Sequence, residues 1–74
     1  MNNIQFDQEI YKRISPREIE VAKAASRGMG QKGTGEVLGI TKNTVQNHRR
    51  SLLRKLGCKN ITEVVTTLKD AGII

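Results

Sequence analysis

Residues 38–56 have the sequence LGITKNTVQNHRRSLLRKL, which combines a short turn with a long cationic segment. Thr41 is a good N-cap and Gly57 supplies a C-terminal stop, so the spacing predicts a helix over 42–56. One side of this helix is apolar and carries Val45, Leu52, Leu53 and Leu56. The segment therefore has both a face that can pack and a face that can remain in solvent.

A second helix is predicted before that turn, beginning at Ser15. Ser15, Pro16 and Glu18 have the pattern of an N-cap, a first helical residue and a capping-box partner. The apolar side continues until Gly28, where we expect this helix to stop.

Between these two segments we expect a short helix from about Gln31 to Leu38, followed by Gly39. Gly33 and Gly35 each cost about 1 kcal/mol relative to Ala in a helix interior, so tertiary packing must hold it. If both glycines lie inside a regular helix with negative φ, Ala at either position should stabilise the domain by about 0.4–1 kcal/mol. The competing interpretation is that the glycines permit a close approach to a neighbouring helix or to DNA.

The fourth predicted helix starts from Asn60, with Glu63 as its capping-box partner, and stops before Gly72. Its apolar residues are Ile61, Val64, Val65 and Leu68. No stretch alternates convincingly at period two, so the sequence predicts an all-α fold with four helices. We divide the chain into residues 1–14, an N-terminal arm or short helix, and residues 15–74, one helical domain.

The composition bounds the class of protein. The chain has 74 residues, enough for one domain, and no apolar run that approaches the roughly 18 residues of a membrane-spanning helix. A single cysteine, Cys58, offers neither a disulfide framework nor a zinc site, so we expect a cytoplasmic protein without a metal or cofactor. His48 is the only histidine and has no carboxylate pattern beside it, and no pair of titratable groups indicates an enzyme.

The charge is distributed unevenly along the chain. The net charge is +6, and no acidic residue occurs between Val37 and Thr62. That acid-free stretch contains Lys42, Arg49, Arg50, Arg54, Lys55 and Lys59. A cationic surface of this kind favours nucleic acid as the partner, and the alternative is an ordinary solvated helix face.

Two helices joined at Gly39-Ile40 and followed by a cationic helix are typical of a helix-turn-helix, whose second helix enters the major groove of DNA. Amide side chains pair with adenine and arginine pairs with guanine, so we expect Gln46, Asn47 and Arg50 to contact bases. The candidates for contacts to the DNA backbone are Lys42, Asn43, Thr44, Arg49 and Arg54.

The chain resembles the LuxR-type (GerE-type) helix-turn-helix domain from about Ile14 to Ile74. The motifs that carry the resemblance are Ser15-Pro16-Arg17-Glu18 with Glu20 and Val21, Leu38-Gly39-Ile40-Thr41, Thr44-Val45 with His48, Leu52, Lys55-Leu56-Gly57, Thr62-Glu63 with Val65, and Gly72-Ile73-Ile74. The resemblance implies a four-helix domain whose third helix is the recognition helix. It also implies a homodimer on double-stranded DNA, with a contact made by the fourth helix. Val64, Val65 and Leu68 are this helix's candidates for the contact, and the alternative is that its apolar stripe packs in the core.

One segment departs from the family's pattern. Residues 30–36 are GQKGTGE, where the family usually shows Ser-Asn-Lys-Glu-Ile-Ala-Glu. Thr34 replaces a buried apolar residue, and Gly33 and Gly35 replace Glu and Ala. We expect the helix that supports the recognition helix to be weaker, with consequences for stability and affinity.

The function expected from these observations is sequence-specific regulation of transcription through double-stranded DNA. The alternative is a protein-binding module of the same fold that modulates another regulator or RNA polymerase without reading DNA. A promoter-reading domain like that of a sigma factor shares this helical plan, but the helix predicted after Gly57 argues against it.

Overall fold

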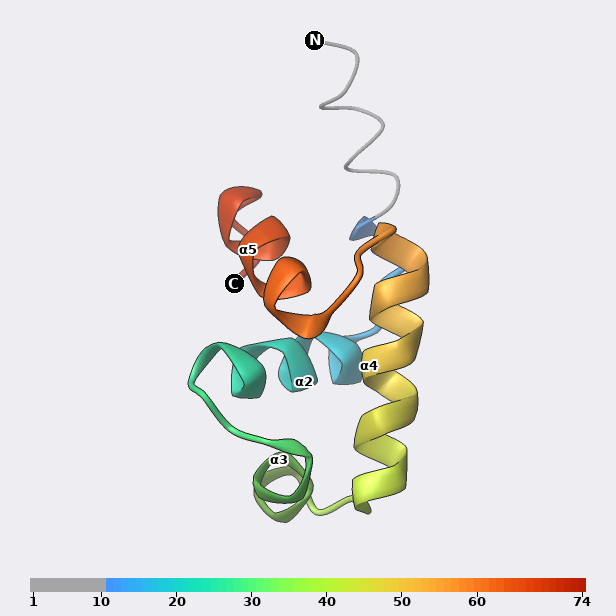
Figure 1. Cartoon of the computed structure of the whole chain (residues 1–74), viewed down its shortest axis with the longest axis vertical. Helices are drawn as coiled ribbons and strands as arrows, with labels where there is room; N and C mark the ends of the chain where they lie inside the picture. Colours follow the sequence, from blue (N-terminus) through green and yellow to red (C-terminus); the bar gives the residue numbers. More distant parts are fainter. Residues whose placement is uncertain (1–10) are drawn as a thin grey trace, which may run out of the picture.

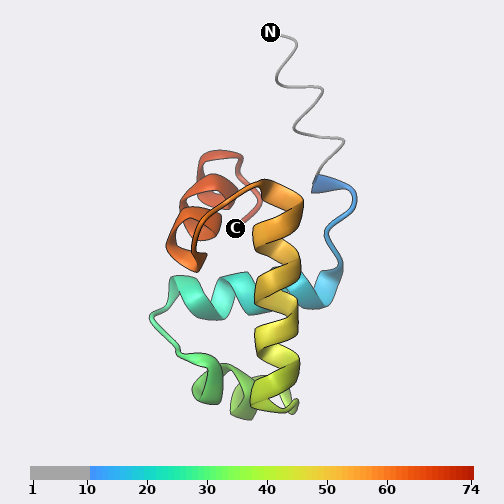
Figure 2. The same cartoon turned by 45° about the vertical axis from the view of Figure 1, so that its right-hand side comes forward.

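The structure is a computed structural model that describes residues 11–74. The described chain forms helices α2 (Pro16–Ser26), α3 (Gln31–Leu38), α4 (Lys42–Leu56) and α5 (Ile61–Asp70). In Figures 1 and 2, α2 crosses the middle of the molecule and α4 runs along its long axis, with α3 near one end and α5 near the other. The all-α, four-helix prediction is confirmed. Most of the expected N-terminal arm, residues 1–10, lies outside the described residues.

Three of the helices begin where a side chain accepts a hydrogen bond from a backbone amide of the first turn. Ser15 forms the predicted capping box: its Oγ accepts from the Glu18 N–H at 3.1 Å, and Glu18 Oε1 accepts from the Ser15 N–H at 2.8 Å. Thr41 caps α4, because its Oγ1 accepts from the Thr44 N–H at 3.1 Å. These short-range contacts explain why the helix starts are visible in the sequence.

The start of α5 corrects one detail of the prediction. Asn60 caps the helix as expected, since its Oδ1 accepts from the Glu63 N–H at 2.9 Å. The Glu63 carboxylate, however, accepts from the N–H of Lys59 at 2.7 Å and not from that of Asn60. The reciprocal capping box is therefore displaced by one residue.

Each of the four described helices is followed, one or two residues after its last residue, by a glycine in the left-handed region, where a side chain would be strained. These glycines are Gly28, Gly39, Gly57 and Gly72. The amide after each glycine donates to a carbonyl five residues earlier: Met29 to Ala24, Ile40 to Gly35, Cys58 to Leu53 and Ile73 to Leu68. The helix ends predicted at these positions are confirmed. The hydrogen bonds from these amides to the last carbonyls explain why each helix stops abruptly.

The core lies between α2, α4 and α5. Its buried cluster consists of Ile14, Ala22, Leu52, Val64 and Leu68. Tyr11 and Ile19 are among the half-buried residues that pack against it. Ile14 is 8% exposed, so the end of the expected arm belongs to this core and accompanies the small Ala22 there. None of the described helices has the length and apolar character needed to cross a membrane.

A partly buried ion pair connects α2 with α4. Lys55 Nζ lies 2.9 Å from Glu18 Oε1 and also donates to the Arg13 carbonyl at 2.8 Å. The Glu18 side chain is only 5% exposed. Burial raises the pKa of Glu18, but hydrogen bonds from Ser51, the Ser15 N–H and Lys55 outweigh burial, so the pKa of this carboxyl lies below its ordinary value.

The two glycines inside α3 have different surroundings. Both have ordinary helical backbone, but a Cβ at Gly35 would lie 2.6 Å from the Ile40 carbonyl oxygen. A Cβ at Gly33 would meet only the Met29 side chain, at 3.9 Å. The expected gain in stability from Ala therefore has room only at Gly33, whereas at Gly35 the competing interpretation of a close approach applies, because the turn packs directly on the helix. Thr34 between them is fully buried, as the family pattern implied.

Candidate nucleic-acid interface

One stripe of α4 consists of polar and cationic side chains that face solvent. Asn43, Asn47, Arg50 and Arg54 follow one another at spacings of four, three and four residues, which places them along one side of a helix. All four are exposed, and within residues 11–74 their side chains have no hydrogen bond or ion pair. Gln46 is half-buried at the edge of this stripe. We call these five residues the α4 stripe.

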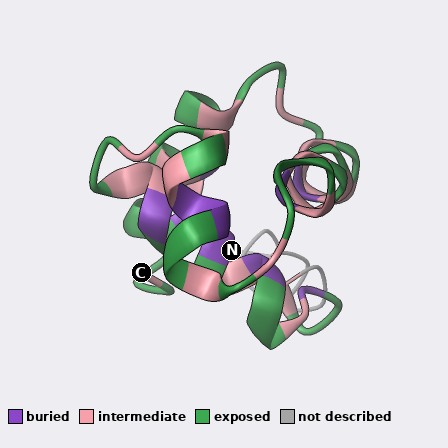
Figure 3. Cartoon of the chain, turned by 90° about the horizontal axis from the view of Figure 1, so that it is seen from below, coloured by how far each residue is buried: buried purple, intermediate pink, exposed green. Residues whose placement is uncertain are grey.

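The opposite side of α4 fixes the helix to the domain. Val45 and Leu52 are fully buried there, and Leu53 and Leu56 are half-buried against the core. Figure 3 looks along α4 and shows that most of its ribbon is exposed or half-buried. A helix held on one side presents the other in a fixed orientation, as a reading surface requires.

The first turn of α4 suits contact with an anion. Lys42 and Asn43 are exposed, and the turn contains no acidic residue. Thr44 is half-buried, with its Oγ1 2.9 Å from Thr41 Oγ1. The Thr41 hydroxyl accepts a hydrogen bond from the Thr44 amide, and the amides that precede Thr44 in α4 have no partner within the helix. Free amides at a helix N-terminus attract phosphate.

Arg49 does not lie with the other candidates for backbone contact. Its Nη2 donates to the carbonyl of Met29 at 3.0 Å, and its Nε is buried without a partner within residues 11–74. Burial lowers the pKa of this guanidinium. The side chain thus turns toward the α2–α3 connection, because position 49 falls beside the buried face of α4 and not on the exposed stripe.

Lys55 is likewise engaged within the domain, through Glu18 and Arg13. The acid-free stretch therefore presents Lys42, Arg50, Arg54 and Lys59 as its exposed cations. His48 is half-buried and has no hydrogen bond within the described residues. The charge pattern of the sequence did not separate the two cations that are bound within the domain from the four that are exposed.

The dimer contact expected at Val64 and Leu68 is wrong for the folded domain. Both side chains are fully buried in the core of this single chain, so neither is available to a partner. Val65 is half-buried. The apolar stripe of a ten-residue helix is narrow, and here the core uses it.

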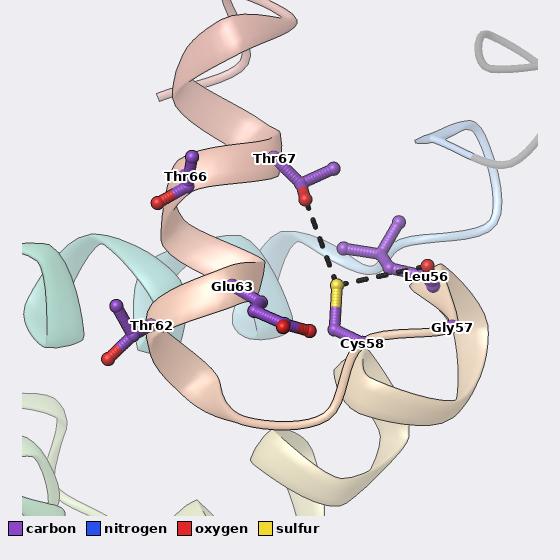
Figure 4. A pocket seen from close by; sticks show the side chains of 7 residues that line it. All are labelled: Leu56, Gly57, Cys58, Thr62, Glu63, Thr66 and Thr67. Atoms are coloured by element: carbon purple, nitrogen blue, oxygen red, sulfur yellow. Dashed lines mark hydrogen bonds between the residues drawn. The ribbon is translucent and has the colours of Figure 1, made fainter.

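Cys58 lies in the connection between α4 and α5, beside a shallow hollow lined by Leu56, Gly57, Thr62, Glu63, Thr66 and Thr67 (Figure 4). Its Sγ is 3.7 Å from Thr67 Oγ1 and 3.8 Å from the Leu56 carbonyl oxygen. Within residues 11–74 no cluster of His, Cys, Asp and Glu is arranged to hold a metal ion.

The geometry agrees with a comparison to known families. Residues 12–68 match the model of the bacterial regulatory proteins of the luxR family. The chain belongs to the luxR family. The resemblance seen in the sequence is thereby confirmed, together with the helix-turn-helix fold that it implied.

Similar proteins carry names of regulators. The transcriptional regulatory protein YdfI of Bacillus subtilis is 31% identical over the whole chain, which corresponds to 37% of YdfI. The transcriptional activator protein BjaR1 of Bradyrhizobium diazoefficiens is 43% identical over 72% of this chain and 22% of its own length. UhpA of Escherichia coli, a transcriptional regulatory protein, is 35% identical over 77% of this chain and 29% of UhpA. The luxR-family domain described here thus spans roughly a third or less of these relatives' lengths.

Proposed function

We propose that this luxR-family domain binds double-stranded DNA in a sequence-specific manner, with α4 as the recognition helix, and that it regulates transcription in the cytoplasm. The observation that carries the proposal is the α4 stripe: amide and guanidinium groups on a helix whose other side is buried. B-DNA's major groove is about 12 Å wide and admits one α-helix. The names of the relatives, which describe transcriptional regulators, support the same function.

The proposed contacts divide by chemistry. Asn47 and Gln46 suit adenine, and Arg50 suits the O6 and N7 atoms of guanine. Four further residues suit phosphate because they flank the positions proposed to contact bases. They are Lys42, Asn43 and Thr44 at the start of the helix, and Arg54 one turn beyond Arg50. Arg49 is left out of this set, since its guanidinium is bound to Met29.

A homodimer on a two-fold site remains part of the proposal, but its contact must differ from the one first expected. Val64 and Leu68 are internal, so a second copy would meet the exposed side of α5 and the half-buried Val65. Sedimentation with and without the preferred duplex would give the oligomeric state. RNA polymerase is a further proposed partner, which a binding assay with purified polymerase would test.

The test is selection of bound sequences from a random duplex pool, followed by affinity measurements on the enriched duplex and a scrambled duplex. We expect enrichment of a defined sequence and an affinity that falls steeply with salt. If no sequence is enriched and the affinity for DNA is independent of salt, the proposal is wrong and the protein-binding module becomes the better interpretation.

The salt dependence also identifies phosphate contacts. Each phosphate neutralised adds about −0.9 to the slope of log K against log salt. Lys42→Ala or Arg54→Ala should therefore flatten the slope by about one unit while sequence preference is retained. Lys23→Ala, on an exposed position of α2, is the matched control and should leave the slope unchanged. A slope that Lys42→Ala and Arg54→Ala do not change would remove these residues from the interface.

A further inference from the structure

The connection between α2 and α3 is held at a single residue, Met29, through its amide and its carbonyl. The N–H of Met29 donates to the Ala24 carbonyl at 3.1 Å and thereby completes the C-terminal cap of α2. The carbonyl of the same residue accepts from Arg49 Nη2 at 3.0 Å. The next residue, Gly30, is the N-cap of α3. Met29 thus joins three helices: it ends α2, precedes α3 and is bound by α4.

The helix that follows has few means of its own to define where it starts. Gly30 provides no side-chain cap, and the first turn of α3 contains no acidic residue. Gly33 and Gly35 lower the helical propensity of the segment. The buried hydroxyl of Thr34 has no hydrogen-bond partner within residues 11–74. The position of the α3 start must therefore depend strongly on contacts from outside the helix.

Arg49 is the side chain that supplies such a contact from α4. It lies 20 residues from Met29 in the chain, so the hydrogen bond fixes α4 and the α2–α3 connection to each other directly. Its Nε is buried without a partner within the described residues, an unfavourable placement that the position against Met29 imposes. A charged donor to a carbonyl is among the stronger hydrogen bonds in proteins.

We propose that Arg49 is a positioning residue for DNA binding, which holds the start of α3 against α4 through the Met29 carbonyl and makes no contact with phosphate. This rests on the proposed function. In a helix-turn-helix the first helix crosses the DNA backbone while the second enters the groove, so the two must reach the duplex in one fixed arrangement. Arg49 secures that arrangement at the end of α3 opposite the Gly39-Ile40 turn.

The first test compares Arg49→Gln with Arg54→Gln on the preferred duplex over a range of salt concentrations. Both variants remove one positive charge from α4. For Arg49→Gln we expect about tenfold weaker binding with an unchanged salt slope, because a hydrogen bond is lost but no counterion contact. For Arg54→Gln we expect a slope flattened by about 0.9. A flattened slope in Arg49→Gln would assign Arg49 to phosphate and overturn the proposal.

The second test asks whether the effect acts through α3. Amide hydrogen exchange in residues 34–38, whose amides are bonded within α3, should become about tenfold faster in Arg49→Gln, while exchange in α5 changes little. Gly33→Ala stabilises α3 at a position where space is free. The variant that carries both substitutions should therefore bind the preferred duplex about threefold more tightly than Arg49→Gln alone. Equal acceleration in both helices, or no recovery in the double variant, would contradict a positioning role.

Circular dichroism must show each variant folded at the binding temperature. If Arg49→Gln is not folded, the salt slope and the amide hydrogen exchange are compared between Gly33→Ala and the variant that carries both substitutions. The same differences in slope and exchange then support or contradict the proposal. Unchanged affinity in Arg49→Gln overturns this proposal alone. If the unmodified domain binds no duplex, the proposed function itself is wrong.

Discussion

Thr34 places a polar side chain in the interior of the domain. It is fully buried in α3, and its Oγ1 has no partner within residues 11–74. Leaving a buried hydroxyl unpaired costs about 1–3 kcal/mol. Thr34→Val keeps the shape of the side chain and removes the hydroxyl, so we expect the free energy of unfolding to rise by about 1 kcal/mol.

Urea denaturation of Thr34→Val checks this expectation, with Thr66→Val as the control. Thr66 is exposed on α5, so its substitution should change the free energy of unfolding by no more than about 0.5 kcal/mol. Equal stability of Thr34→Val and the unmodified domain would mean that a water molecule or a shifted rotamer satisfies the hydroxyl.

At the scale of the element, α3 contains two glycines for which opposite effects are expected. Gly33→Ala should stabilise the domain by about 0.4–1 kcal/mol, because the helix gains propensity and the new methyl group has room. Gly35→Ala should destabilise it by about 1 kcal/mol, since its Cβ would lie 2.6 Å from the Ile40 carbonyl oxygen and overpacking exceeds the gain in propensity. Urea melts of both variants decide the point, and a gain in stability for Gly35→Ala would show that the turn moves away freely.

The elements themselves were largely predictable from the sequence because their ends depend on neighbouring residues. Ser15, Thr41 and Asn60 bond to amides three residues later, and glycine follows each helix at the expected distance. Features that depend on distant residues were not predictable in this way. The approach of Ile40 to Gly35 and the bond from Arg49 to Met29 both require the packed arrangement of the helices.

The candidate site shows the same division. Helical spacing places Asn47 and Arg50 on the exposed side of α4, and the structure has them there. The spacing could not show that Val64 and Leu68 are used by the core of one chain, because an apolar stripe fits a core and a dimer contact equally well. Only the position of α5 against α2 and α4 distinguishes the two.

For the whole molecule, the Glu18–Lys55 pair predicts how stability depends on pH. The pKa of Glu18 is lowered in the folded state, so the pair's contribution is present above the ordinary carboxyl pKa and is lost as the pH falls through the lower folded value. Glu18→Gln should reduce the free energy of unfolding at pH 7 by about 1–3 kcal/mol and flatten its dependence on pH in the acidic range.

Chemical denaturation between pH 7 and the acid limit of folding measures this dependence. Glu20→Gln is the control, because within residues 11–74 Glu20 pairs only with Arg17, at an exposed site, and such pairs contribute little. A parallel pH dependence in Glu18→Gln and the unmodified domain would contradict the assigned role of the pair.

The proposal that Gln46, Asn47 and Arg50 of the α4 stripe contact bases has a direct test in the affinities of Asn47→Ala and Arg50→Ala for the preferred and the scrambled duplex. Both residues are exposed, Asn47 in the N-terminal half of α4 and Arg50 near its middle. Their side chains have no hydrogen bond or ion pair within residues 11–74. We expect a loss of about 1–3 kcal/mol on the preferred duplex and little change on the scrambled one, so that sequence preference is relaxed. Equal losses on both duplexes would place these residues among the backbone contacts and contradict the proposal.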